Sequence, residues 1–94
     1  MNKMINLDEY VGKAVHCRTK ELANEFLKLA HEQGWHWIMG ESLVEKNYWN
    51  KYKECICYYL NRDKDITCRN IIFYRFHDKQ IIEFEGREKN VSTK

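Results

Sequence analysis

The chain has 94 residues, of which 44% are hydrophobic and 32% are charged, and its formal net charge is +2; this composition is typical of one ordinary folded domain and excludes a disordered chain. No apolar stretch approaches the roughly 20 residues that cross a bilayer, and the N-terminal residues contain no apolar signal segment, so we expect a cytoplasmic protein whose four cysteines are reduced. Residues 45–75 hold seven basic side chains against four acidic ones, an excess too small for a protein that reads duplex DNA.

The N-terminal part of the chain predicts a helical turn, a strand and one long helix. A capping pattern predicts the turn over residues 7–11, and the small apolar side chains of residues 13–17 favour a strand. Thr19 then caps a long amphipathic helix, which Gly34 ends in the left-handed conformation. Its apolar face is formed by Leu22, Ala23, Phe26, Leu27, Leu29 and Ala30, which recur at helical spacing and must therefore cover a sheet.

The middle of the chain predicts two strands separated by an irregular segment. Residues 35–39 alternate as a strand does, up to Gly40. Residues 41–53, called the aromatic loop below, follow neither helical nor strand periodicity, and we expect an ordered loop there. Residues 54–60 alternate strongly and predict the clearest strand of the chain.

The C-terminal part predicts further strands joined by tight turns. A polar turn at residues 61–65 should return the chain antiparallel. Residues 66–69 favour a short strand, residues 70–76 continue with strand alternation, and residues 79–85 favour a charged edge strand. Residues 86–94 are polar and predict a disordered tail.

Together these elements predict a fold of the α+β class in two layers. One long helix packs on a mostly antiparallel sheet of four to five strands. We expect residues 1–85 to form a single α+β domain, followed by the polar tail of residues 86–94.

The cysteines and histidines do not predict a metal site or a catalytic pair. Cys55 and Cys57 are two apart on a predicted strand and lack the turn of a zinc knuckle, so we expect neither metal nor cofactor. His16 and Cys17 are neighbours on a strand and should point to opposite faces. Because the sequence also lacks a Gly-rich phosphate loop, we expect a protein that is not an enzyme.

The aromatic loop is the strongest candidate for a functional site. Large amphipathic rings beside ammonium groups suit an acidic protein surface or an anionic nucleotide. The predicted site, called the aromatic–basic surface below, consists of Lys46, Tyr48, Trp49, Lys51, Tyr52 and Lys53. We expect at least one of its three rings to remain exposed. The same rings, together with Trp35 and Trp37, could instead pack on the open side of the helix and the sheet.

An ordered set of residues between positions 5 and 85 also carries a resemblance. It comprises Val15-His16-Cys17, Thr19, Phe26-Leu27, Gly34-Trp35, Trp37, Gly40, Leu43, Trp49, Tyr52-Lys53-Glu54, Cys57-Tyr58 and Ile81-Ile82-Glu83-Phe84. This pattern resembles small, mostly uncharacterised phage and prophage accessory proteins of Gram-positive bacteria. The resemblance implies an intracellular viral protein in the host cytoplasm. Small proteins of this kind often inhibit a host function, including defence, by stoichiometric binding.

Three functional hypotheses follow from these observations. The first is a non-enzymatic phage accessory protein that inhibits a host defence function by binding a host protein or sequestering a small nucleotide signal. The second is a single-stranded nucleic-acid binding module that uses the rings for stacking, and the third is a small enzyme. The predicted edge strand at residues 79–85 favours a homodimer, whereas Glu83 and Glu85 favour an edge that stays unpaired.

Overall fold

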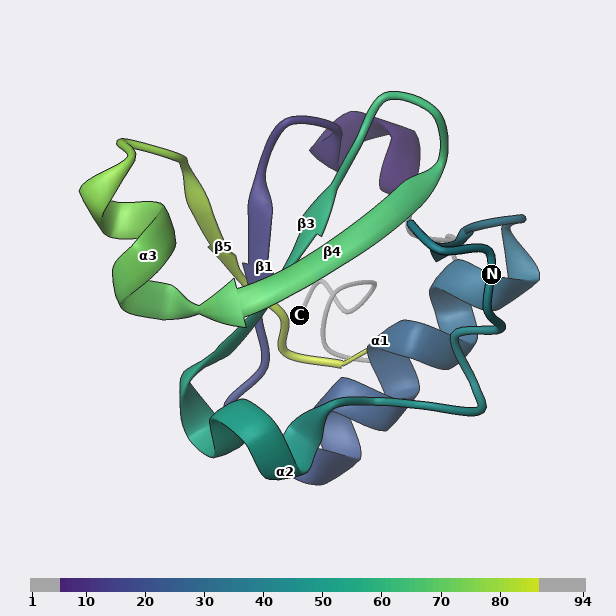
Figure 1. The fold of residues 1–94 in the computed structure, drawn as a ribbon, viewed down its shortest axis with the longest axis horizontal. Helices are drawn as coiled ribbons and strands as arrows, with labels where there is room; N and C mark the ends of the chain where they lie inside the picture. The colour runs from purple at the N-terminus through teal and green to yellow at the C-terminus, as the bar shows by residue number, and fades with distance from the viewer. Residues whose placement is uncertain (1–5, 87–94) are drawn as a thin grey trace, which may run out of the picture.

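The structure, a computed structural model, describes residues 6–86 and contains a five-stranded sheet with helices on both faces (Figure 1). In chain order the elements are η1 (Leu7–Tyr10), β1 (Ala14–His16), α1 (Lys20–Glu32), β2 (His36–Trp37), α2 (Trp49–Tyr52), η2 (Lys53–Cys55), β3 (Ile56–Leu60), β4 (Asp65–Asn70), α3 (Ile71–Phe76) and β5 (Ile81–Glu83), where η marks a 3₁₀ helix. Within residues 6–86, none of the helices combines the length and the apolar character that a membrane crossing requires. The predicted α+β class is confirmed.

The sheet is mixed, so the prediction of a mostly antiparallel sheet is wrong. The strand order is β2-β4-β3-β1-β5. β3 is antiparallel to its neighbours β1 and β4, whereas β2 is parallel to β4 and β5 is parallel to β1. Among the described strands, β3 alone therefore runs against the other four. The last strand, β5, lies at an edge of the sheet as predicted.

Two helical crossovers each join a pair of strands that run in the same direction but are not neighbours in the sheet, a connection that a tight turn cannot make. α1 connects β1 to β2 across one face of the sheet, and α3 connects β4 to β5 across the other. The two crossovers run in opposite directions along the strand order and lie on opposite faces, so they have the same hand, as such connections normally do. The prediction of a strand over residues 70–76 is wrong, and the second crossover takes its place.

Helix α3 replaces the predicted strand because Asn70 caps it. The backbone of Asn70 is extended, and its Oδ1 accepts a hydrogen bond from the N–H of Ile72 at 2.8 Å. Ile71 and Tyr74, three residues apart, then point together towards the sheet and are buried there. Six residues are too few for the alternation of apolar side chains to distinguish a helix from a strand.

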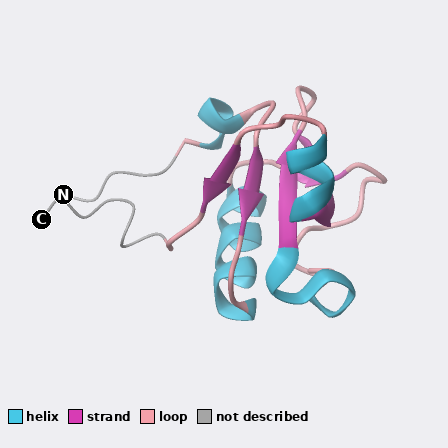
Figure 2. Ribbon diagram, turned by 90° about the vertical axis from the view of Figure 1, so that its left-hand side faces the viewer, coloured by secondary structure: helices cyan, strands magenta, loops and turns pink. Residues whose placement is uncertain are grey.

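Helix α1 has 13 residues, close to the average for globular proteins, so the prediction of one long helix is wrong. Its predicted cap is confirmed, since Thr19 Oγ1 accepts from the N–H of Leu22 at 3.1 Å. The helix ends before Gly34, whose φ of +91° lies in the left-handed region. The N–H of Trp35 then bonds to the carbonyl of Ala30 at 3.0 Å, which folds Trp35 back onto the last turn. α1 runs along the strands on one side of the sheet (Figure 2).

Smaller boundary differences lie on either side of the aromatic loop. β2 stops at Trp37, since the N–H of Gly40 turns back to the carbonyl of Trp37 at 2.7 Å. The aromatic loop contains the single-turn helix α2, and the 3₁₀ helix η2 follows, so β3 begins at Ile56 instead of residue 54. Residues 1–5 of the predicted domain and residues 87–94 of the predicted tail lie outside the described residues.

The two faces of the sheet bury different amounts of apolar surface. The face under α1 holds the main core, formed by Leu7, Val15, Cys17, Ala23, Phe26, Leu27, Leu29, Ala30, Trp35, Trp37, Leu43, Ile56, Tyr58, Leu60, Ile66 and Phe84. The face under α3 holds a second cluster of Ala14, Cys57, Ile71 and Tyr74. Alternation along β3 divides the side chains between the two faces as the sequence predicted.

Candidate functional site

Buried rings fix the aromatic loop to the main core. The indole Nε1–H of Trp37 donates to the carbonyl of Lys46 at 3.0 Å, and the hydroxyl of Tyr58 donates to the carbonyl of Asn47 at 2.7 Å. The side chain of Asn47 accepts in turn from the N–H of Trp49, the first residue of α2, at 2.9 Å. These hydrogen bonds order the loop before any partner binds. Binding would therefore cost less conformational entropy than it would with a flexible loop.

The three rings of the aromatic–basic surface are divided between the core and solvent. Tyr48, Trp49 and Tyr52 are all half-buried and pack against the main core. Tyr48 also meets the ring of Trp37 edge-on, with 4.9 Å between the centroids. None of the three rings is fully exposed, so a partner could reach only part of each.

Two of the three tryptophans are buried in the main core, and the third is half-buried at the surface. Trp35 and Trp37 are 2% and 3% exposed and belong to the main core. Trp49 begins α2 at the surface and keeps part of its ring accessible. The packing interpretation therefore holds for Trp35 and Trp37, and only Trp49 is available for contact.

The three lysines of the aromatic–basic surface are exposed, but they differ in their partners. The ammonium group of Lys46 lies 3.1 Å from a carboxylate oxygen of Glu41, and this hydrogen bond raises the pKa of Lys46. The ammonium group of Lys51 lies 5.8 Å from the centre of the Tyr52 ring. Neither Lys51 nor Lys53 forms an ion pair with the residues described, so both present an uncompensated charge.

Two strained residues flank helix α2. Tyr48 and Lys53 have φ angles of +58° and +53°, in the region that side-chain-bearing residues rarely adopt. Each such conformation costs about 1 kcal/mol or more and is maintained only when neighbouring contacts impose it. Strain of this kind occurs at binding sites and also in tight turns, where Lys64 and Asp78 have positive φ angles in this chain.

A groove of about 760 Å³ separates α1 from the aromatic loop. It is lined by Asn24, Leu27, Lys28, His31 and Glu32 of α1, and by Leu43, Val44, Glu45, Lys46, Asn47, Tyr48 and Asn50. The volume lies in the range of small-molecule pockets. Lys28 and Lys46 are balanced by Glu32 and Glu45, so this groove offers no net charge to an anion.

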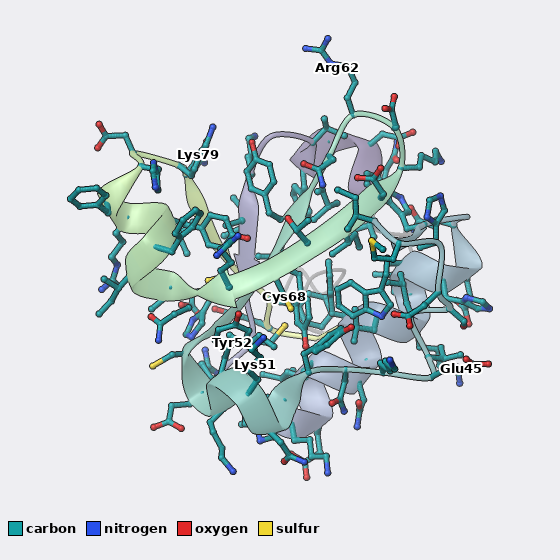
Figure 3. All side chains as sticks on the ribbon, viewed as in Figure 1. Glu45, Lys51, Tyr52, Arg62, Cys68 and Lys79 are labelled. Atoms are coloured by element: carbon teal, nitrogen blue, oxygen red, sulfur yellow. The ribbon has the colours of Figure 1, made fainter. Side chains whose placement is uncertain are left out.

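A second hollow, of about 250 Å³, lies between α2 and the edge of the sheet. It is lined by Trp37, Ile38, Met39, Glu41, Tyr48, Lys51, Tyr52, Ile66, Thr67, Cys68 and Arg69. Figure 3 shows Lys51 and Tyr52 beside Cys68 of β4. We call this space the β4 hollow.

The structure brings four of the six predicted site residues to these two spaces. Lys46 lines the groove, Lys51 and Tyr52 line the β4 hollow, and Tyr48 lines both. Trp49 and Lys53 line neither space. The prediction missed Arg69, which adds a second cation to the β4 hollow, because its contribution depends on strand pairing that the sequence does not reveal.

Burial keeps three of the four described thiols, those of Cys17, Cys57 and Cys68, protonated. It raises the pKa of Cys57 from 9.0 to about 12 and that of Cys68 to about 11, and it raises the pKa of Cys17 well above its ordinary value. The thiolate is the reactive form of cysteine, so these residues are poor nucleophiles. Within residues 6–86, no group of three His, Cys, Asp or Glu side chains could hold a metal ion.

Both ring nitrogens of His16 contact other groups of the protein. His16 faces away from Cys17, which is buried under α1, as the strand alternation predicted. Its Nδ1 lies 2.5 Å from a carboxylate oxygen of Glu83, and its Nε2 lies 2.7 Å from the carbonyl of Glu54. Both ring nitrogens therefore face acceptors, and His16 links β1 to β5 and to η2.

Helix α3 carries an exposed apolar face that the sequence pattern did not predict. Ile72 and Phe76 are 65% and 82% exposed, and Phe73 lies 4.5 Å below the guanidinium of Arg69. The spacing of Ile72 and Phe76 by four residues is a helical signal, whereas strand alternation places them on one face together with Tyr74, which the helix buries.

A scan against protein-family models found no match. Neither a comparison with curated proteins nor one with solved structures found a match. The function therefore has to be inferred from the surfaces of this chain.

Proposed function

We propose that this protein is a non-enzymatic phage accessory protein that inhibits a host defence function by stoichiometric binding of a host protein. Binding takes place through the aromatic–basic surface, which comprises Lys46, Tyr48, Trp49, Lys51, Tyr52 and Lys53. The resemblance to small phage proteins supports the biological setting. The arrangement of the aromatic loop supports the mode of action.

The observation on which the proposal depends is the preorganised loop. Hydrogen bonds from Trp37 and Tyr58 hold a loop with half-buried rings, exposed lysines and strained residues at both ends of α2. Partly exposed Tyr and Trp rings are enriched at protein interfaces because they supply contact area at low entropy cost. The raised pKa values of Cys57 and Cys68 favour binding over nucleophilic catalysis.

A protein partner fits the surface better than the other two ligand classes. The groove beside α1 is large enough for a nucleotide signal, but its lysines and glutamates balance. Stacking on single-stranded nucleic acid needs open ring faces, whereas Tyr48, Trp49 and Tyr52 pack against the main core. An acidic protein surface needs only the exposed edges of the rings and the ammonium groups of Lys51 and Lys53.

The test is capture of a partner from a lysate of a Gram-positive host, followed by identification and reconstitution with purified partner. Native mass spectrometry should show a complex of fixed stoichiometry. The double variant Lys51→Glu, Lys53→Glu should weaken binding at least about tenfold, since it replaces two attractive charges by repulsive ones. Both lysines are exposed, so the fold should be retained.

The matched control is Arg62→Glu, which reverses an exposed charge in the turn between β3 and β4. Arg62 points away from the molecule at the end opposite Lys51 (Figure 3). It should bind like the unmodified protein. Equal affinity of the double variant and the unmodified protein would overturn the proposed surface, and a retained small molecule of a few hundred daltons in place of a protein would overturn the proposed partner class.

A further inference from the structure

Strand β4 has an edge that its neighbour covers only in part. β2 pairs with Asp65 and Ile66 alone, and the last bond runs from the N–H of Ile38 to the carbonyl of Ile66 at 3.1 Å. The chain then turns away at Gly40. Among the described residues, no strand lies beside residues 67–70 on this side, although β4 continues to Asn70.

Strand alternation shows which backbone groups are left open. The carbonyl of Asp65 bonds to β3, at the N–H of Asn61, whereas the carbonyl of Ile66 bonds to β2. Successive residues of a strand point their N–H and C=O groups to opposite sides. Thr67 therefore faces β3, and the N–H and C=O of Cys68 face the open edge.

The β4 hollow lies along this open edge and adds side-chain contacts. Tyr48 and Tyr52 line it from the aromatic loop, and Met39, 83% exposed, lines it from the turn after β2. When a peptide adds as a strand to the edge of a sheet, its backbone pairs with the open backbone groups and its side chains contact neighbouring pockets. Aromatic rings and a flexible thioether suit such pockets.

The charge of the β4 hollow is positive. Lys51 and Arg69 line it, and neither forms an ion pair with the residues that the structure describes. The one acidic side chain in the lining, Glu41, is already paired with Lys46. Lys51 comes from the α1 side of the sheet and Arg69 from the α3 side, where its guanidinium lies over Phe73.

We propose that an extended, acidic segment of the partner protein adds to β4 as a short strand at residues 67–70. Its backbone pairs with the N–H and C=O of Cys68. Because adjacent side chains of a strand point to opposite faces, two neighbouring acidic residues meet Lys51 on one face and Arg69 on the other. This inference rests on the proposed function and names the binding mode at part of the same surface.

A second copy of this chain is a weaker candidate for the occupant. Its strand β5 combines apolar and acidic residues, but Glu83 is already held by His16 and Arg18. Pairing of one edge of the sheet with the opposite edge of another copy would also be a head-to-tail contact that does not close into a dimer.

The probe is a synthetic peptide, acetyl-Thr-Val-Glu-Glu-Val-Thr-amide, titrated into the isotope-labelled protein. The amide signals of residues 67–70 should shift, and hydrogen exchange of the Cys68 N–H should slow at saturation. The same peptide with lysines in place of the glutamates should bind at least about tenfold more weakly, since it repels Lys51 and Arg69. Shifts confined to another surface, or none at millimolar peptide, would overturn the inference.

Two N-methylated peptides separate strand pairing from attraction between charges. Each carries one methyl group on the backbone nitrogen of one of the two glutamates. Neighbouring N–H groups point to opposite sides of a strand, so one methyl blocks pairing with β4 and the other points to solvent. One analogue should lose binding and the other should keep it; equal binding by both would exclude strand addition.

Protein variants connect this test to the proposed function. Arg69→Glu should lower the affinity for the acidic peptide at least about tenfold. Arg62→Glu, in the turn between β3 and β4, should leave that affinity unchanged (Figure 3). If the peptide fails but Lys51→Glu, Lys53→Glu still abolishes partner capture, the strand inference is wrong and the proposed function stands. If the peptide binds at β4 but the double variant captures the partner normally, the proposed surface is wrong.

Discussion

The two faces of the sheet are covered to very different degrees. Under α1, the main core contains aromatic side chains that are fully buried, such as Phe26 and Tyr58. Under α3, the second cluster holds four buried residues, while Ile72 and Phe76 remain exposed on the same helix. The α1 face therefore buries more apolar surface than the α3 face, which retains exposed apolar side chains.

The largest expected effect lies on the α1 face. Phe26 is fully buried, stacks on Tyr58 at 5.5 Å between ring centroids and meets Phe84 edge-on at 5.4 Å. Phe26→Ala should lower the free energy of unfolding by about 3–5 kcal/mol, because it removes a ring and leaves a cavity. Urea unfolding monitored by circular dichroism measures the loss.

The same substitution on the α3 face is the control. Phe76 is 82% exposed, so Phe76→Ala should change the free energy of unfolding by no more than about 0.5 kcal/mol. Comparable losses in the two variants would show that the exposed ring of Phe76 packs in the folded protein, and the contrast between the faces would disappear.

An intermediate effect is expected where the main core holds the aromatic loop. Tyr58→Phe removes the hydroxyl that donates to the carbonyl of Asn47 at 2.7 Å. The variant leaves that carbonyl without its partner, which should lower the free energy of unfolding by about 1–3 kcal/mol. Amide hydrogen exchange should accelerate in residues 47–53 while α3 stays unchanged; uniform acceleration throughout the chain would instead indicate that the loop and the core unfold together.

A smaller loss of stability should appear at alkaline pH. Burial raises the pKa of Cys57 from 9.0 to about 12. The unfolded state therefore loses this proton first, so the contribution of this thiol to stability is constant below about pH 8 and falls as the pH rises from about 9 towards 12. At pH 10 the loss should be about 1 kcal/mol for this thiol.

Cys57→Ala isolates that contribution, because tyrosines and lysines also titrate in this range. Urea unfolding at pH 7 and pH 10 should show a smaller pH-dependent loss in the variant than in the unmodified protein. An unchanged pH dependence would mean that the thiol is solvated and titrates normally in the folded state.

The parts of the fold that the sequence predicted are those set by local patterns. The capping hydroxyl of Thr19 and the alternation in residues 56–60 depend on neighbours along the chain, and the charged outer face of residues 79–85 indicated the edge position of β5. The mixed sheet could not be predicted in this way, because the pairing of β1 with β5 joins residues 67 positions apart, such as His16 and Glu83.

Helix α3 and the backbone conformation of Tyr48 could not be predicted from the sequence, for two other physical reasons. In α3, apolar side chains at nearly every position satisfy strand and helix periodicity equally, and the capping side chain of Asn70 decides between them. In the aromatic loop, Tyr48 adopts a left-handed conformation that local preference disfavours and that its contact with Trp37 favours. The residue types of the candidate site were predictable, but its second cation, Arg69, was not.

The short length of the open β4 edge bears on the solubility of the protein. Exposed strand edges promote aggregation, and the segments that stack into fibrils are typically about six or seven residues long with low charge. The open edge at residues 67–70 is shorter than this, ends where α3 begins and carries the charge of Arg69. The molecule can thus expose unpaired backbone groups without offering copies of itself a template long enough for fibrillar growth.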